Sequence, residues 1–275
     1  MRRQARAILS VAGSDPSGGA GIQADIKTLT VLGVYGAAAV TAVTVQNSLG
    51  MESCQPLAPE LVAAQVRAVL ADLKVSHVKI GMIGSRAVAQ AIGQELADFA
   101  GEVFYDPVIS SSVGRPLSAT DGLEGVWRVA GLATVMTPNL PELSLLAGRE
   151  LINAEQALLA GAELFARLPK LKAVVLKGGH LDEGRPEVSD FLLLPGLPPL
   201  SRRHPRVITP NTHGTGCTFA AALAAYHQRG GDYRRAFEQT VDFLAHLLQL
   251  GAGWRLGQGN GGLCHHLLCS PKDDG

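Results

Sequence analysis

The sequence predicts one α/β domain over residues 1–275, in which a mostly parallel sheet is covered by helices on both faces. Short β-branched runs alternate with segments of helical periodicity along most of the chain. These runs are continuously apolar, which is typical of strands buried on both faces. The unusual loops, which are rich in glycine or polar residues, each follow one of these runs. Ligands collect at the carboxyl ends of parallel strands, so these loops outline a site.

The expected elements follow one another in chain order. We expect strands at residues 7–11, 38–45, 77–80, 103–105, 133–136 and 173–176, and antiparallel edge strands at 188–194 and 206–208. We expect helices at residues 18–32, 85–99, 154–168 and 233–250, one opened by Pro59 and one that carries Cys217 near its start. The Pro- and Arg-rich stretch 184–205 is expected to be a surface excursion, and the ends 1–6 and 264–275 are expected to be flexible.

The composition excludes several classes of partner. Lys and Arg total 24, as do Asp and Glu, so no bulk charge would attract nucleic acid or anionic lipid. No stretch reaches the roughly 18 uninterrupted apolar residues of a membrane-spanning helix. The four cysteines lack CxxC spacing, which favours free thiols in a reducing compartment. We therefore expect a cytoplasmic protein that binds neither nucleic acid nor membrane.

The stretch 211–218, NTHGTGCT, is the centre of the predicted site. Gly214 and Gly216 allow a tight turn, and the Ala- and Leu-rich run behind them predicts a helix. Amide groups of Gly214, Thr215, Gly216 and Cys217 would form an anion hole for a transferring phosphoryl group. At this helix start the thiol of Cys217 should have a lowered pKa and act as a general base. The alternative is a small core cysteine beside a glycine turn.

Polar residues after three other strands suggest a metal and a phosphate site. Asn139 and Glu142 are spaced to hold hydrated Mg²⁺, although the same pair would also make an ordinary helix cap. Asp106 before Pro107 would face the same metal or form an Asx turn. Lys177 would neutralise phosphate oxygens, unless it is a solvated strand-end lysine.

Seven loop segments together resemble those of one family: AGSDPSGGAGIQAD at 12–25, TVQNSLG at 44–50, VKIGM at 78–82, DPV at 106–108, TPNLPE at 137–142, LKGGH at 176–180 and THGTGCT at 212–218. On these segments, and over about residues 7–263, the sequence is similar to the hydroxymethylpyrimidine/phosphomethylpyrimidine kinases of thiamine biosynthesis, which belong to the ribokinase-like superfamily. This resemblance implies a ribokinase-like three-layer sandwich, ATP with Mg²⁺, and a homodimer. It also implies phosphorylation of 4-amino-5-hydroxymethyl-2-methylpyrimidine to the monophosphate and then to the diphosphate.

An aminopyrimidine needs a flat, mostly apolar slot with a few in-plane polar partners. Asp25 would accept from the exocyclic amine, and Gln46 offers both a donor and an acceptor. The resemblance places both in the pyrimidine pocket, although singly each is also an ordinary polar helix or turn residue. The substrate-binding set is Asp25, Gln46, Val45, Met82, Gly13 and Ala20. The nucleotide-binding set is Asn139, Glu142, Lys177 and Thr215, with Asp106 and Glu142 at the metal.

Two rival functions fit the same motifs. Some bacterial enzymes that resemble this family act on pyridoxal, and many sugar and pyridoxal kinases of the superfamily carry Asp at the position of Cys217. A non-catalytic sensor of the vitamin precursor would keep the pocket, but the presence of Lys177, Glu142 and Cys217 argues against it. The motifs of P-loop NTPases, zincins and α/β-hydrolases are absent.

Overall fold

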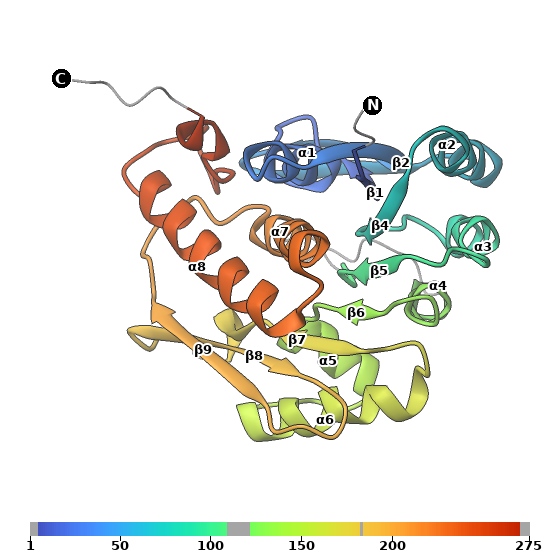
Figure 1. Ribbon diagram of the computed structural model, residues 1–275. Helices are drawn as coiled ribbons and strands as arrows, with labels where there is room; N and C mark the ends of the chain where they lie inside the picture. The colour runs from blue at the N-terminus through green and yellow to red at the C-terminus, as the bar shows by residue number, and fades with distance from the viewer. Residues whose placement is uncertain (1–4, 109–121, 182–183, 270–275) are drawn as a thin grey trace.

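A single twisted sheet of nine strands forms the middle layer of the protein (Figure 1). The computed structural model describes residues 5–108, 122–181 and 184–269. The strand order is β3-β2-β1-β4-β5-β6-β7-β8-β9, with parallel pairing from β2 through β7 and antiparallel pairing at both edges. The strands are β1 (Ala7–Ser14), β2 (Tyr35–Asn47), β3 (Gly50–Pro56), β4 (Val75–Ile80), β5 (Glu102–Tyr105), β6 (Val135–Met136), β7 (Ala173–Leu176), β8 (Glu187–Leu193) and β9 (Leu200–Pro205).

Helices cover both faces of this sheet, so the predicted α/β sandwich is confirmed (Figure 1). One face carries α2 (Pro59–Asp72), α3 (Arg86–Glu95), α4 (Gly122–Ala130), α5 (Leu140–Ala147) and α6 (Ala154–Arg167). The other face carries α1 (Gly21–Val31), α7 (Thr215–Gly230) and α8 (Tyr233–Gly251). Two short 3₁₀ helices complete the fold, η1 (Gly178–His180) and η2 (His265–Leu268).

The alternation of strand side chains divides the buried residues into two cores. In β5, Phe104 packs against the layer of α7 and α8, whereas Val103 and Tyr105 pack against the opposite layer. The central strands are therefore apolar on both faces, which explains their continuous apolar runs. In the part of the chain that the structure describes, no helix combines the length and the apolar composition that crossing a bilayer requires.

The predicted positions fail mainly at the edges of the sheet. The residues at 206–208 are not a strand, and Ile208 is 93% exposed. The last strand is instead the polar segment β9, which pairs with β8, so most of the predicted surface excursion is a hairpin that extends the sheet. The edge strand β3 was not predicted because its residues are mostly polar and at least partly exposed. The short helices α4 and α5 were not predicted either.

The expectation of a flexible end is wrong for residues 264–269. Cys264 is fully buried, and His265 is 2% exposed between α1 and α7. Its Nε2 lies 3.0 Å from the Thr28 hydroxyl and 3.2 Å from the Thr218 hydroxyl. This segment is therefore part of the packed structure. The remainder of the predicted flexible end, 270–275, and residues 1–4 lie outside the described residues.

Candidate active site

Helix α7 begins at the predicted glycine turn. Gly214 is its N-cap with φ 82°, a conformation that favours glycine, and a Cβ there would lie 1.9 Å from the carbonyl oxygen of Gly19. The amide of Thr215 donates to the carbonyl of Thr212 at 3.3 Å. The amides of Gly216 and Cys217 lie in the first turn, where no carbonyl four residues earlier belongs to the helix. The positive end of the helix dipole therefore coincides with the predicted anion hole.

The predicted lowering of the Cys217 pKa is wrong. Burial raises the pKa of this thiol to about 11, and the nearby ammonium of Lys79 and the amide of Gly21 only partly offset that effect. The sequence-based expectation depended on the helix dipole, which lowers the pKa of a thiol at a helix start. Desolvation by the surrounding layers raises that pKa by more. Cys217 is therefore a neutral thiol at pH 7 in the ligand-free protein.

Asp106 and Lys177 form a buried ion pair beside the first turn of α7. The Nζ of Lys177 lies 2.7 Å from Oδ1 of Asp106, which also accepts from the Thr137 hydroxyl at 2.9 Å. A Cβ at Gly216 would lie 3.3 Å from Lys177 Nζ and 3.4 Å from Asp106 Oδ2. Burial alone would raise the pKa of Asp106, but the charges of Lys177 and Lys79 lower it. An ionised carboxylate and an ammonium therefore meet at the mouth of the helix.

One oxygen of this pair has no partner. Oδ2 of Asp106 is buried and makes no hydrogen bond to any residue that the structure describes. A buried acceptor that is left unsatisfied is costly, and such atoms in native structures often mark the place of an ion or a water. An anionic oxygen with open coordination is the kind of ligand that Mg²⁺ takes, and Mg²⁺ keeps several waters. Asp106 therefore fits the predicted metal site.

Asn139 and Glu142 form the capping box that was the alternative to a magnesium site. The Asn139 side chain accepts from the Glu142 amide at 2.9 Å, and Oε2 of Glu142 accepts from the Asn139 amide at 2.8 Å. The same Oε2 lies 3.7 Å from Nζ of Lys177, so the cap faces the Asp106 pair. Burial raises the pKa of Glu142 to about 7, against the charge of Lys177. Among the described residues, no group of three or more His, Cys, Asp or Glu side chains forms a metal cluster.

Asp25 lies in a second buried ion pair, where its oxygens are already used. Lys79 Nζ lies 2.9 Å from both carboxylate oxygens, and the Ser10 hydroxyl donates to Oδ2 at 2.6 Å. Asp25, Lys79 and Ser10 are all 0% exposed. In the ligand-free protein Asp25 is therefore an internal partner of Lys79, which differs from the predicted open acceptor for an amine. The sequence signal that would have identified Lys79 is a lysine inside the otherwise apolar run VKIGM.

The other predicted pocket residues are not all brought together. Val45 is 53% exposed, and the pairing of β2 with β3 has an irregularity between Val45 and Gln46. Gln46 contacts His213 at the start of the Cys217 loop, with its Nε2 2.9 Å from the ring Nε2. A Cβ at Gly13 would lie 2.1 Å from the Met82 methyl group, so these two residues are in direct contact. The amide of Ala20 donates to Asp15 at 2.8 Å.

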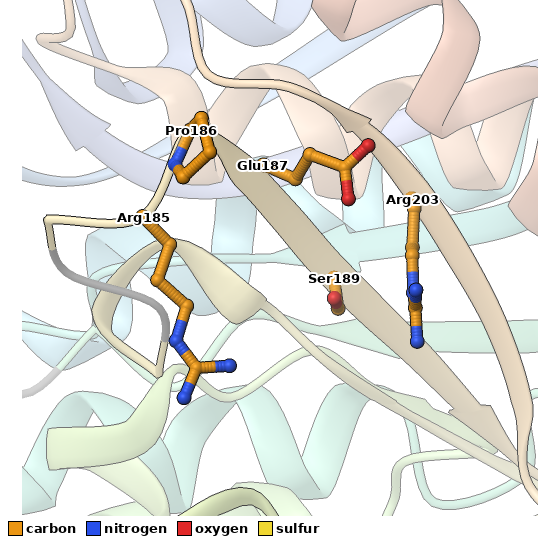
Figure 2. Close-up of a pocket in the computed structure, with 5 residues that line it drawn as sticks. All are labelled: Arg185, Pro186, Glu187, Ser189 and Arg203. Carbon is orange, nitrogen blue, oxygen red and sulfur yellow. The ribbon is translucent and has the colours of Figure 1, made fainter.

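A hollow lies on the β8–β9 hairpin (Figure 2). It is lined by Arg185, Pro186, Glu187, Ser189 and Arg203. None of them belongs to the predicted site, and the hollow contains no buried carboxylate or thiol. We therefore assign the chemistry to the start of α7.

Comparison with known proteins shows the family of the chain. The family model described as phosphomethylpyrimidine kinase matches residues 15–264. A hydroxymethylpyrimidine/phosphomethylpyrimidine kinase of Rhizobium meliloti is 39% identical over 258 residues, 94% of this chain and 96% of that protein. The crystal structure of a phosphomethylpyrimidine kinase from Clostridium difficile has a TM-score of 0.75 at 30% identity, over 88% of this chain and 99% of that one.

The fold is also shared with kinases of another vitamin. An ADP complex of Bacillus subtilis pyridoxal kinase has a TM-score of 0.83 at 29% identity, over 97% of this chain and 99% of that one. The predicted ribokinase-like architecture and the kinase activity are thereby confirmed. The family match over most of the chain, together with the position of Cys217, Lys177 and Asp106 around one helix start, identifies this chain as a member of the phosphomethylpyrimidine kinase family.

Proposed function

We propose that the protein transfers the γ-phosphoryl group of ATP to 4-amino-5-hydroxymethyl-2-methylpyrimidine, and then a second group to the resulting monophosphate. The observation that carries this proposal is that the Asp106–Lys177 ion pair lies beside Gly216. It places an ammonium that can bind phosphate oxygens, and a carboxylate that can bind a metal ion, at the unpaired amides of a helix start. The family match and the activity of the Rhizobium meliloti relative support this choice of acceptor. The ADP complex of the pyridoxal kinase supports the donor.

Phosphoryl transfer requires chiefly positioning and the stabilisation of charge. In the proposed reaction Lys177 balances the charge on the transferring oxygens, and the amides of Gly216 and Cys217 donate to them. The thiolate of Cys217 accepts the proton of the acceptor hydroxyl. Because the ligand-free thiol has a pKa of about 11, only a small fraction is in this form at pH 7.

The second step makes a weaker demand on Cys217. A phosphate monoester is already ionised near neutral pH, so its attacking oxygen carries no proton that must be removed. The two steps should therefore differ in their dependence on the thiol while sharing Lys177. This difference offers an internal test of the assigned roles.

We include Mg²⁺ in the proposal because the residues present fit it. Asp106, with its unpartnered oxygen, and Glu142, 3.7 Å from Lys177, would hold the ion, in part through water. When bound, the ion supplies positive charge to the phosphate oxygens. Glu142 must be ionised for this role, and its pKa of about 7 means that binding of the ion should weaken below that pH.

The test is product analysis by mass spectrometry with ATP and Mg²⁺. The pyrimidine alcohol, its monophosphate and pyridoxal are offered to the purified protein in separate reactions. We expect the monophosphate from the first and the diphosphate from the second. Failure to phosphorylate the pyrimidine alcohol would contradict the proposal. Faster turnover of pyridoxal would favour the rival function, a pyridoxal kinase. We include pyridoxal because the structure is similar to that of the Bacillus subtilis pyridoxal kinase.

Three expectations on assembly and location stay predictions. A homodimer, a cytoplasmic location and the absence of a nucleic-acid partner are part of the proposal. Size-exclusion chromatography with light scattering would test the first of them.

A further inference from the structure

Three side chains from separate segments meet beside the proposed pocket. Asp15 lies in the loop after β1, Gln46 near the end of β2, and His213 directly before α7. Oδ2 of Asp15 lies 2.8 Å from Nε2 of His213, and Nε2 of Gln46 lies 2.9 Å from the same ring atom. One imidazole nitrogen therefore has two polar neighbours. The carboxylate of Asp15 requires a donor there, whereas an NH₂ group of Gln46 would require an acceptor.

Asp15 determines where the imidazole proton lies. Its carboxylate already accepts from the Ser17 amide at 2.9 Å, the Ser17 hydroxyl at 3.0 Å and the Ala20 amide at 2.8 Å. Burial raises the pKa of Asp15, but the hydrogen bonds from His213 and Ser17 outweigh it and lower the pKa to about 2. Asp15 is therefore an anion that can only accept. His213 must place a proton on Nε2 to approach it, whether the ring is neutral or charged.

The proton on Nε2 in turn determines the orientation of Gln46. A carboxamide NH₂ only donates, so it cannot face another N–H at 2.9 Å. The oxygen and nitrogen of a carboxamide have nearly the same shape, and their assignment follows from the hydrogen-bond network. The stable arrangement has the carboxamide oxygen of Gln46 toward His213, where it shares the Nε2 proton with Asp15. The NH₂ group then points away from His213.

We propose that Asp15 and His213 act as positioning residues that fix the carboxamide of Gln46 with its NH₂ group toward the substrate. The inference rests on the proposed function for the identity of the ring beside Gln46. A fixed donor selects ligands that present a hydrogen-bond acceptor there, such as an unprotonated ring nitrogen. A ring with C–H at that place leaves the donor unpaired, which is unfavourable in a half-buried site.

The first test locates the proton directly. Nitrogen-15 spectra of the ligand-free protein report which ring nitrogen of each histidine is protonated, and the His213 signals are assigned by their loss in His213→Gln. We expect Nε2 of His213 to be protonated between pH 6 and 8. A neutral ring with the proton only on Nδ1 would overturn the inference, whatever the activity of the protein.

The second test measures ligand selection by calorimetry without ATP. The ligands are the pyrimidine alcohol and its two pyridine analogues, in which one or the other ring nitrogen is replaced by C–H. For the native protein we expect one analogue to bind about tenfold more weakly than the parent, the size of one hydrogen bond with its donor left unsatisfied. Equal binding of all three ligands would overturn the inference.

Matched variants separate positioning from general damage. His213→Gln keeps a donor toward Asp15 and should retain the tenfold preference, whereas His213→Met removes the donor and should reduce it to below about threefold. Ser17→Ala removes a different donor to Asp15 and should leave the preference unchanged. A native preference that persists in a folded His213→Met would overturn the inference. Ligand selection without phosphorylation would sustain it and contradict only the proposed function.

Discussion

Two buried carboxylate–ammonium pairs flank the start of α7, and they differ in one respect. In the Asp25–Lys79 pair every carboxylate oxygen has a partner, since Lys79 contacts both and Ser10 donates to one. In the Asp106–Lys177 pair one oxygen has none. Lys79 is completely buried, whereas the side chain of Lys177 is 15% exposed. The first pair is closed and the second is open to a ligand.

This difference shows how burial alone misleads about function. All four groups are ionisable and lie in the interior or at its edge, and a charge in such a place is usually paired. The closed pair satisfies that requirement within the protein and joins α1 to β4. The open pair satisfies it only in part, because Oδ2 of Asp106 lacks a partner, and a cation is what would supply one.

The largest effect should come from breaking the open pair. Lys177→Met should lower the rate of both phosphorylations by about 10³-fold, since it removes a charge aimed at the transferring group. The double variant Lys177→Met with Asp106→Asn should not restore the rate, because the role that we propose for the pair is catalytic. Steady-state rates with ATP and each acceptor are the measurement. Recovery in the double variant would mean that the second pair is structural, like the first.

Breaking the closed pair should act on stability. Lys79→Met leaves the Asp25 carboxylate buried without its partner and should lower the free energy of unfolding by about 3–5 kcal/mol. The double variant Lys79→Met with Asp25→Asn should regain most of this loss, because no unpaired charge remains. Urea denaturation followed by circular dichroism measures both variants. A double variant as unstable as the single one would contradict the interpretation.

Cys217 lies close enough to both lysines that its thiolate would interact with the charge of each, so it links the two pairs. Cys217→Ala should lower the rate of the first phosphorylation by about 10²-fold and change pyrimidine affinity by less than about tenfold. The second phosphorylation should be less affected. Because the thiol has a raised pKa of about 11, the native first step should also accelerate about tenfold per unit between pH 8 and 10, as the thiolate fraction grows. A flat profile over this range would exclude the thiolate as base.

The smallest effect is expected from an uncharged contact, that of His265 with Thr28 on α1, the helix that also carries Asp25. His265→Ala removes the ring between the Thr28 and Thr218 hydroxyls and should lower the free energy of unfolding by about 1–3 kcal/mol. Lys79→Met should exceed this loss. If the two variants lose the same free energy of unfolding, an unpaired buried charge costs no more than the loss of an uncharged contact.

The sequence predicts which residues form the site better than it predicts their pKa values and their ion pairs. Lys177 and Asp106 were predicted together because each directly follows a strand, and parallel strands end at one edge. The glycine turn was placed with them after a strand expected at 206–208, where the structure has a loop between β9 and α7. The raised pKa of Cys217 was not predicted, since desolvation depends on layers of protein that come from distant segments. The pairing of Asp25 with Lys79, 54 residues apart, has the same cause.

The edge strands failed for a related reason. Val207 and Ile208 are β-branched and were read as a strand, yet the pairing strand is the polar β9 segment that precedes them. An edge strand needs only a neighbour for its backbone, so its side chains carry little apolar signal. Asp15 and His213 belong to the motifs that carry the resemblance, but their mutual contact spans 198 residues and is visible only in the fold.

The contact of His265 with Thr218 has a consequence for how the protein is made. The two residues are 47 apart in the chain, so the helix that carries Cys217 leaves the ribosome well before the side chain that packs behind it. Domains acquire their final packing only when all of the contributing segments have emerged. Nascent chains arrested before residue 263 should therefore contain the whole sheet and yet lack a fully anchored catalytic helix.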